Sequence, residues 1–471
     1  MKFSSPFIDG DGSLQTSSSI IKALGNFSGI TSPARCAARI GQAFTETPFT
    51  LPVQNVVVEY IEDITSSDES RVFSDGIGTI SLEVVERIWK GIPQKKGTPT
   101  CFQVRLGGAK GMLSLDSRLE GSVIRIRPSM VKFSTDDMRD LGICGMASEP
   151  YPLVLNRQIV KILEDIGVPD DWFFGLQNDR LRQLQLITSS ADKTATFLKD
   201  AKIADSIGLY KLFRWCYWMD LDYREDPFLR SIVEAMILRE LRLLKHKSRI
   251  PVPQGMTLYG IIDETGYLKE NEVFITFDTI SGLYAAPPGP GPVLVTRSPA
   301  LYDGDIQAAR NVVPPPDHPL ARHKNCITFS QQGARDLPSQ LSGGDLDGDL
   351  YHVIWDPIVA KVHTSPPANY ARVVPHDIGR VVTTKDMAYF FVEFMKTDCV
   401  GIIATRHMIL ADQEPEGTHA SGCKLLAELH STAVDYSKSG VPVDMAKIPS
   451  TGRFRPDLYV FISHSVVNVK C

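Results

Sequence analysis

Two separated parts of the chain alternate between apolar and polar positions. From about 50 to 133, Gly, Asp and Ser separate short segments such as NVVVEYI, GIGTIS, FQVRLGG and SVIRIRP. The pattern returns from 251 to 357 in TLYGIIDE, EVFITFD and LYHVIWD, with the Pro/Gly run AAPPGPGP at 285–292 as an interruption. Alternation with turn residues between the segments is typical of β-strands, so we predict two β modules.

The segment between these modules has a helical period instead. Apolar residues recur there at a spacing that places them on one face of a helix. Two such stripes are Leu155, Ile159, Ile162, Leu163 and Ile166, and Val233, Ile237, Leu241 and Leu244. Helical periodicity resumes after about 380. The order strands, helices, strands, helices predicts an α+β fold with helices packed around two β modules.

These changes of pattern divide the chain into five parts. We expect a poorly defined lead-in, a first β module, a helical connector, a second β module and a helical C-terminal segment, at residues 1–32, 33–140, 141–250, 251–357 and 358–471.

Composition narrows the class of protein. The chain is 43% apolar and 22% charged, as expected of a soluble globular protein. It contains no apolar run long enough for a membrane helix, and its start lacks the apolar stretch of a secretory signal, so we expect an intracellular protein without a membrane partner. The net charge of −5 argues against a simple RNA-coating module but allows an enzyme with cations in a channel and carboxylates at its centre.

The segment SGGDLDGDLYHVIWD carries the clearest chemical signal. Asp345, Asp347 and Asp349 alternate in it with glycines before and between them. Three carboxylates this close repel one another unless a cation lies among them, and hard oxygen ligands suit Mg²⁺. The apolar run that follows predicts a strand, so the triplet should lie on a loop at a strand end. The pattern predicts a magnesium site for phosphoryl or nucleotidyl transfer, without separating a polymerase from a phosphatase.

Two other interpretations of the triplet are weaker. An EF-hand calcium loop would use Asp345, Asp347, Asp349 and Asp356, but its sixth position needs glycine and holds Leu350, and strands rather than helices are predicted around it. An ordinary acidic turn would explain two acids, but it explains three alternating acids with three glycines less well.

Motifs along the chain resemble one family. SGGDLDGD is similar to the catalytic signature of the eukaryotic RNA-dependent RNA polymerases that amplify silencing RNAs, and less similar to NADFDGD of the largest subunit of DNA-dependent RNA polymerases. Other motifs of the silencing family follow in the expected order between roughly 33 and 457: CAARIGQAFTET, SDGIGTIS, FQVRLGGAKGML, IRIRPSMVKF, YGIIDETGYL, VLVTRSPALYDGDI, FSQQGARDLPSQ and DYSKSG. Members of this family are usually longer at both ends, so we expect a truncated catalytic core.

The resemblance implies a fold and a set of site residues. It implies two double-psi β-barrels facing each other across a catalytic cleft, the second of which presents the three aspartates. Lys110 and Lys132 of the first barrel would be catalytic cations, which suits the roughly four negative charges of a nucleoside triphosphate. Arg335 would contact the phosphate or ribose of the nucleotide, with a surface salt bridge as the alternative, and Arg105 and Arg127 would follow the RNA backbone.

The expected activity is magnesium-dependent RNA-directed RNA polymerisation. By resemblance, a single-stranded RNA template and ribonucleoside triphosphates would give double-stranded RNA for gene silencing, with RNA-silencing proteins as partners and the nucleus or the cytoplasm as location. A DNA-templated polymerase is the enzymatic alternative. The other is a catalytically inactive remnant that binds RNA or silencing proteins. Primer dependence, template preference and oligomeric state stay open.

Overall fold

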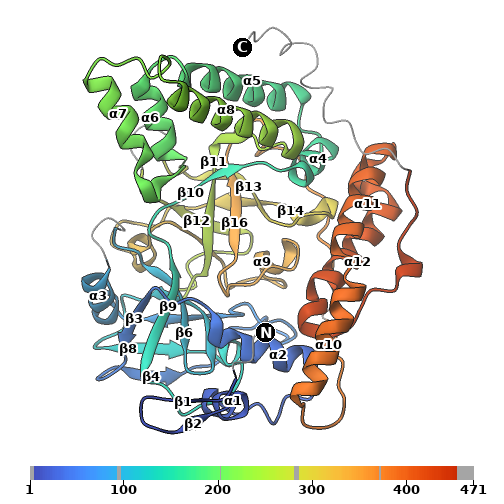
Figure 1. Ribbon diagram of the computed structural model, residues 1–471. Coiled ribbons are helices and arrows are strands. Elements are labelled where there is room, and N and C mark those ends of the chain that lie inside the picture. The colour runs from blue at the N-terminus through green and yellow to red at the C-terminus, as the bar shows by residue number, and fades with distance from the viewer. Residues whose placement is uncertain (1–4, 93–96, 202, 280–285, 371–372, 453–471) are drawn as a thin grey trace.

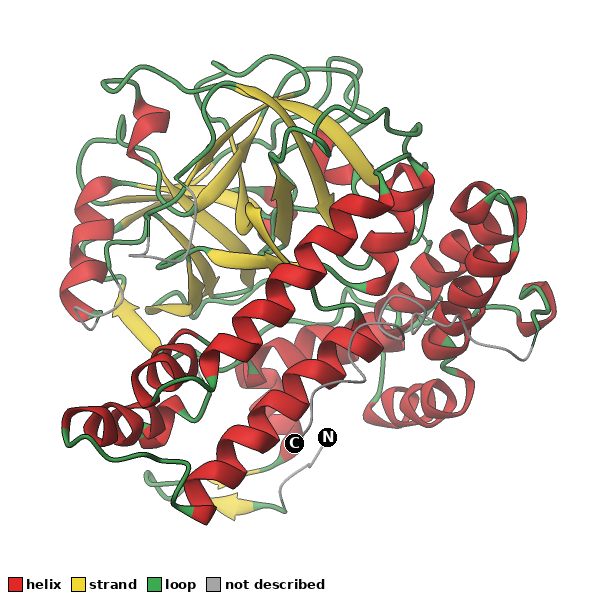
Figure 2. Cartoon of the chain, turned by 90° about the horizontal axis from the view of Figure 1, so that it is seen from above, coloured by secondary structure: helices red, strands yellow, loops and turns green. Residues whose placement is uncertain are grey.

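The computed structural model describes residues 5–92, 97–201, 203–279, 286–370 and 373–452. Two β modules lie one above the other, with helices above them and along one side (Figure 1). Seen from above, the strands gather on one side of the molecule and the long helices on the other (Figure 2).

The first module is a seven-stranded sheet with the order β3-β9-β6-β7-β5-β8-β4. Its strands are β3 (Phe49–Pro52), β4 (Val57–Tyr60), β5 (Ile77–Ile80), β6 (Cys101–Leu106), β7 (Ala109–Leu115), β8 (Val123–Ile126) and β9 (Asp140–Met146). Helix α3 (Leu82–Gly91) buries Val84, Val85 and Ile88 in the same core. Because β9 begins at Asp140, this sheet extends past the boundary that the sequence pattern suggested at residue 140.

The second module contains a closed barrel. Strands β11 (Pro251–Ile262), β15 (Cys326–Phe329), β12 (Glu272–Thr276), β14 (Ile306–Asn311), β13 (Gly291–Arg297) and β16 (Leu350–Ile354) pair in that order, and β16 pairs again with β11. The length of β11 allows this closure, because Gly255–Tyr259 pair with β16 and Tyr259–Ile262 pair with β15. Strand β10 (Tyr151–Val154), within the range expected to be a helical connector, pairs with β11 from outside the ring.

Helices surround the two modules. The connector forms α4 (Arg157–Asp165), α5 (Asp170–Ile187), α6 (Ala191–Asp200), α7 (Leu209–Trp218) and α8 (Pro227–Lys247) above the second module (Figure 1). On one side lie α10 (Thr384–Thr397), α11 (Val400–Gln413) and α12 (Ser421–Ser439). The lead-in forms β1 (Phe7–Ile8), β2 (Leu14–Gln15) and α1 (Ser17–Leu24), followed by α2 (Pro33–Gly41), which packs against α10 and α12.

The two modules share a core. One buried cluster includes Ile77 and Met112 of the first module and Leu346 and Tyr351 of the second. Burial of this shared apolar surface fixes the modules against each other at the place where the aspartate triplet lies. Within the described part of the chain, no helix combines the length and apolar character that crossing a bilayer requires.

Candidate active site

The three aspartates converge on a turn between the short helix α9 (Leu337–Gln340) and β16. One carboxylate oxygen from each of Asp345, Asp347 and Asp349 lies within 4.8 Å of the others. Two backbone amides hold this arrangement, since Asp345 N donates to Asp349 Oδ2 at 3.1 Å and Asp347 N donates to Asp345 Oδ1 at 3.1 Å. The sequence prediction of a loop at a strand end is confirmed.

The start of β16 fixes the position of the turn. The buried Tyr351 donates a hydrogen bond through its hydroxyl to Asp345 O at 2.7 Å. Gly348 has a φ of +125°, which residues with a side chain rarely adopt, and a Cβ there would lie 2.2 Å from Gln103 Nε2. Gln103 in turn donates to Asp347 O at 3.3 Å. The first module therefore contacts the aspartate turn directly.

The three carboxyl groups differ in their electrostatics. Burial, and then repulsion from Asp347 and Asp349, raises the pKa of Asp345 well above its ordinary value. Burial also acts to raise the pKa of Asp347, but attraction to Lys110 and other cations outweighs it and leaves that pKa lowered. A charged Asp345 is therefore costly in this structure unless another cation joins the group.

The first module contributes the expected lysines. Lys110 Nζ lies 2.7 Å from Asp347 Oδ2, an ion pair between the two modules. Lys132 donates a hydrogen bond to Ser129 O, and burial lowers its pKa although Asp75 and Asp347 counteract this. Both lysines face the aspartate turn, while their catalytic role stays a prediction.

The three predicted arginines have different surroundings. Arg105 pairs with Lys110 across β6 and β7, and its Nη1 donates to Val104 O at 2.9 Å. Arg335 donates to Ser339 O and Ala368 O at 2.6 and 2.8 Å. It therefore joins α9, which precedes the triplet, to the segment around Ala368. Contacts of these two residues with RNA or nucleotide stay predictions.

Arg127 requires a correction. It is only 2% exposed, and its guanidinium forms two hydrogen bonds with the carboxylate of Glu264, at 2.9 and 2.8 Å. A third hydrogen bond joins Arg127 Nη1 to Ile77 O at 2.9 Å. The expected contact with the RNA backbone is wrong for this structure, because the buried guanidinium joins the two modules instead.

The sequence pattern missed Arg297. Its Nε lies 2.7 Å from Asp349 Oδ2, and its Nη1 donates to Ser342 O at 3.2 Å. The pair forms because Arg297 stands opposite Tyr351 in the antiparallel pairing of β13 with β16. The contact depends on how β13 aligns with β16, and no local sequence signal predicts that alignment.

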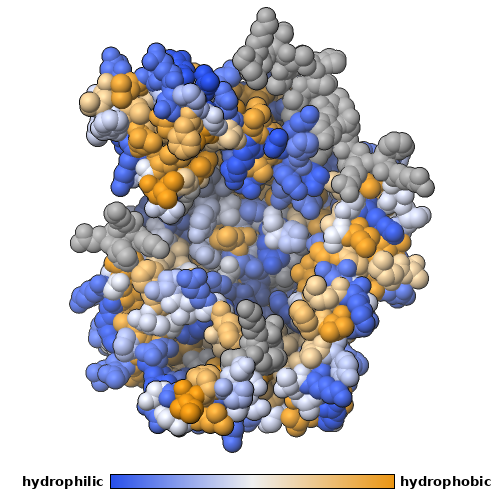
Figure 3. All heavy atoms as spheres, viewed as in Figure 1, coloured by the Kyte–Doolittle hydropathy of each residue, from blue (hydrophilic) through white to orange (hydrophobic). Residues whose placement is uncertain are grey.

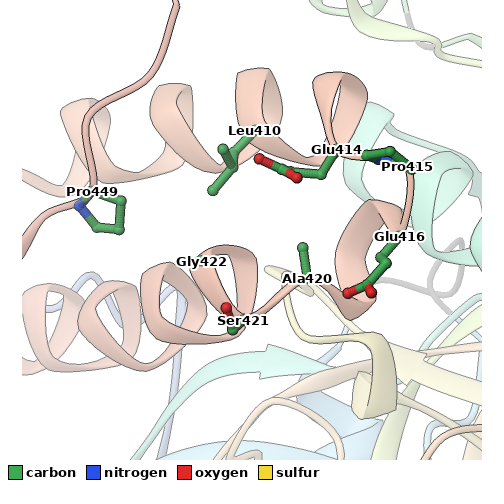
Figure 4. Close-up of a pocket in the computed structure, with 8 residues that line it drawn as sticks. All are labelled: Leu410, Glu414, Pro415, Glu416, Ala420, Ser421, Gly422 and Pro449. Carbon is green, nitrogen blue, oxygen red and sulfur yellow. The ribbon is translucent and has the colours of Figure 1, made fainter.

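The triad fits a divalent cation. It offers three converging carboxylates, and burial followed by repulsion from the other two raises the pKa of Asp345. Oxygen ligands of this kind suit hard cations. A separate pocket of about 470 Å³ between α11 and α12 is lined by residues including Leu410, Glu414 and Pro449 (Figure 4). That pocket contains none of the predicted site residues.

Comparison with known proteins defines the class. The model of the family described as RNA dependent RNA polymerase matches residues 1–460, and the chain belongs to this family. Among its relatives are the probable RNA-dependent RNA polymerase 2 of Oryza sativa subsp. japonica, 32% identical over 90% of this chain and 38% of the relative, and RNA-dependent RNA polymerase 2 of Arabidopsis thaliana, 33% identical over 90% and 38%. The chain thus spans well under half the length of these two proteins.

A solved structure supports the fold. The RNA dependent RNA polymerase QDE-1 from Thielavia terrestris superposes with a TM-score of 0.77 and 22% identity, over 92% of this chain and 52% of that one. This likeness confirms the expected α+β fold built on double-psi barrels.

Proposed function

We propose that the chain is an RNA-directed RNA polymerase, with Mg²⁺ as its cofactor and ribonucleoside triphosphates and a single-stranded RNA template as substrates. The observation that carries the proposal is the convergence of three carboxylates within 4.8 Å, opposite Lys110 of the other module. Membership of the RNA dependent RNA polymerase family supports the class of reaction.

Each residue of the site has a role in this proposal. Asp345, Asp347 and Asp349 would hold Mg²⁺, which when bound activates the attacking hydroxyl and offsets charge on the phosphates. Lys110 carries three N–H donors, so it can bind phosphate oxygens while it remains beside Asp347. Lys132 is close enough to Asp347 to lower the pKa of that carboxyl. The two lysines would stabilise the negative charge of the departing pyrophosphate.

The product would be double-stranded RNA, which is the basis for proposing a role in gene silencing together with other silencing proteins. Resemblance to the silencing polymerases supports this role, and both the nucleus and the cytoplasm suit it.

The test is incorporation of labelled ribonucleotides on single-stranded RNA with Mg²⁺. Asp347→Ala removes one carboxylate of the triad, and we expect incorporation to fall about a thousandfold or more. Asp356→Ala is the matched control, because this acid lies past the opposite end of β16 and its carboxylate accepts the amide of Ile358; it should retain activity. Incorporation by Asp347→Ala at the level of the parent would contradict the proposal. Absence of incorporation by the parent, with RNA binding intact, would favour the inactive remnant.

A further inference from the structure

Helix α2 lies outside both β modules and carries CAARIG, the first half of the motif CAARIGQAFTET. The proposed reaction assigns no role to this segment. Ser32 caps the N-terminus of α2, accepting a hydrogen bond from Arg35 N, and Pro33 occupies the first turn. Its apolar face buries Cys36 and Ile40. The helix packs against α12 so closely that a Cβ on Gly440 would lie 3.2 Å from Ala34 Cβ. Figure 1 shows α2 in front of the first module, beside α10. This packing fixes the direction of the polar face of α2.

Arg39 of α2 lies within electrostatic range of the aspartate turn. Arg39 is partly buried, and it is close enough to Asp347 and Lys132 for its charge to act on both. In the described part of the chain its guanidinium forms no hydrogen bond or ion pair, whereas Lys110 pairs with Asp347 at 2.7 Å. An arginine offers five N–H donors, so a partly buried guanidinium without partners has donors available for a ligand.

Positive charge exceeds negative charge at this end of the site. Arg39, Lys110, Lys132 and Lys438 of α12 act on the carboxylate of Asp347, and Asp75 also attracts Lys132. Burial lowers the pKa of Arg39, and repulsion from Arg35 contributes to this; Arg39 and Lys110 in turn oppose the charge of Lys132. Cations that are partly buried and repel one another are stabilised when an anion joins them. An anion with several charges would fit this group better than one more carboxylate.

We propose that Arg39 binds phosphate oxygens of the incoming nucleoside triphosphate, beside Lys110 and Lys132. A guanidinium can donate two parallel hydrogen bonds to one phosphate, which the point charge of a lysine cannot do. The inference rests on the proposed polymerase function and deepens it, since it assigns a phosphate-binding role to a helix outside both barrels. Phosphate could also come from the RNA backbone, so the experiment separates the two sources.

The experiment measures binding rather than synthesis, so it can succeed or fail independently of polymerase activity. Affinity for inorganic triphosphate, without added divalent cation, is compared with affinity for a single-stranded RNA oligonucleotide that carries a 5′-hydroxyl. We expect Arg39→Ala to weaken triphosphate binding about tenfold or more and to change oligonucleotide binding less than about twofold, because one charge-assisted contact is lost. Arg39→Lys, which keeps the charge but not the paired donors, should give an intermediate loss.

Arg35→Ala is the matched control, because Arg35 lies one turn earlier on the same helix with an exposed side chain. It removes the same charge from α2 and should leave triphosphate affinity within about twofold of the parent. Unchanged triphosphate binding in Arg39→Ala would overturn the proposal. So would an equal loss in Arg35→Ala, or a loss confined to the oligonucleotide. Thermal unfolding of each variant checks that it folds, and Arg39→Gln, which keeps much of the side chain, replaces Arg39→Ala if that variant does not.

Discussion

At the scale of single residues, the three carboxylates of the triad have different neighbours. Asp347 pairs with Lys110 of the first module and Asp349 with Arg297 of the second, each at 2.7 Å. Asp345 forms no ion pair with a described residue, and burial together with repulsion raises its pKa. Asp345 is therefore the carboxylate whose charge depends most on a bound cation.

Arg297→Met should destabilise the protein most when no divalent cation is present. The substitution leaves Asp349 unpaired beside two other acids, and we expect a loss of about 2 kcal/mol in the free energy of unfolding. Saturating Mg²⁺ should reduce this loss, because the bound cation supplies the missing positive charge. Urea unfolding with and without Mg²⁺ measures both values. Arg310→Met, a substitution of an exposed arginine on the neighbouring strand β14, is the control; an equal loss with and without Mg²⁺ would count against this account.

At this scale the sequence predicted the residues whose signal is local. The convergence of Asp345, Asp347 and Asp349 follows from their spacing and from the strand after them. Arg297 could not be predicted, because its contact depends on the pairing of β13 with β16. Arg127 was misassigned because it follows the last residue of β8, where the alternation of the strand ends, and its side chain turns into the core towards Glu264.

At the scale of elements, a turn of the first module supports the aspartate turn of the second. Leu346 N donates to Asp75 O at 2.9 Å, and Met112 N donates to Gly76 O at 2.9 Å. Gly76 has a φ of +87°, and a Cβ there would lie 2.5 Å from Asp347 Cβ. The backbone of the first module therefore sets the position of Asp347 as directly as Lys110 does.

Gly76→Ala should reduce nucleotide incorporation more than it reduces stability. The new methyl group would displace Asp347, while the strained φ would cost about 1–3 kcal/mol in the free energy of unfolding. We expect incorporation to fall about a hundredfold, since small displacements at a reacting centre have effects of this size. Gly91→Ala is the control, because a Cβ there meets nothing within 4 Å. If nucleotide incorporation by Gly76→Ala fell only in proportion to its folded fraction, the result would show that the turn does not position the triad.

The elements themselves were predicted better than their grouping into modules. Alternation along 50–133 and 251–357 predicted the strands, because burial of one or both faces leaves a local pattern. The boundary at 140 was misplaced, because β9 pairs with β3 and β6 of the first sheet, and β10 pairs with β11 of the second. Such pairings join segments that are distant in the sequence, so the local pattern of residues does not predict them.

At the scale of the whole molecule, the buried His323 and His407 and the half-buried His352 connect stability to pH. His352 of β16 forms hydrogen bonds with Thr257 Oγ1 of β11 at 2.7 Å and with Ser298 Oγ, just after β13, at 3.0 Å. Burial lowers the pKa of His352, His323 and His407 from 6.5 to about 4. Between these two values the unfolded chain binds protons that the folded chain does not, so stability falls as the pH drops from 6.5 to 4.

His352→Gln should reduce the slope of the free energy of unfolding against pH by the contribution of about one proton. Glutamine keeps a donor and an acceptor but does not titrate, so the variant should lose about 1.4 kcal/mol less per pH unit in this window. Urea unfolding at about pH 7.5 and about pH 5 measures the difference. Burial raises the pKa of Asp305 to about 6, which acts in the opposite direction but equally in both proteins. Parallel pH profiles would mean that His352 is not buried as a neutral group.

The central claim, RNA synthesis directed by an RNA template, is tested most directly by the identity of the nucleotide that is incorporated. The protein is given all four ribonucleoside triphosphates and Mg²⁺ on single-stranded RNA templates that each contain one base, and the product is sequenced. We predict that each template yields only its complementary ribonucleotide, and that the matching DNA templates yield less product. The same mixture of nucleotides on every template, or more product from DNA than from RNA, would contradict the claim.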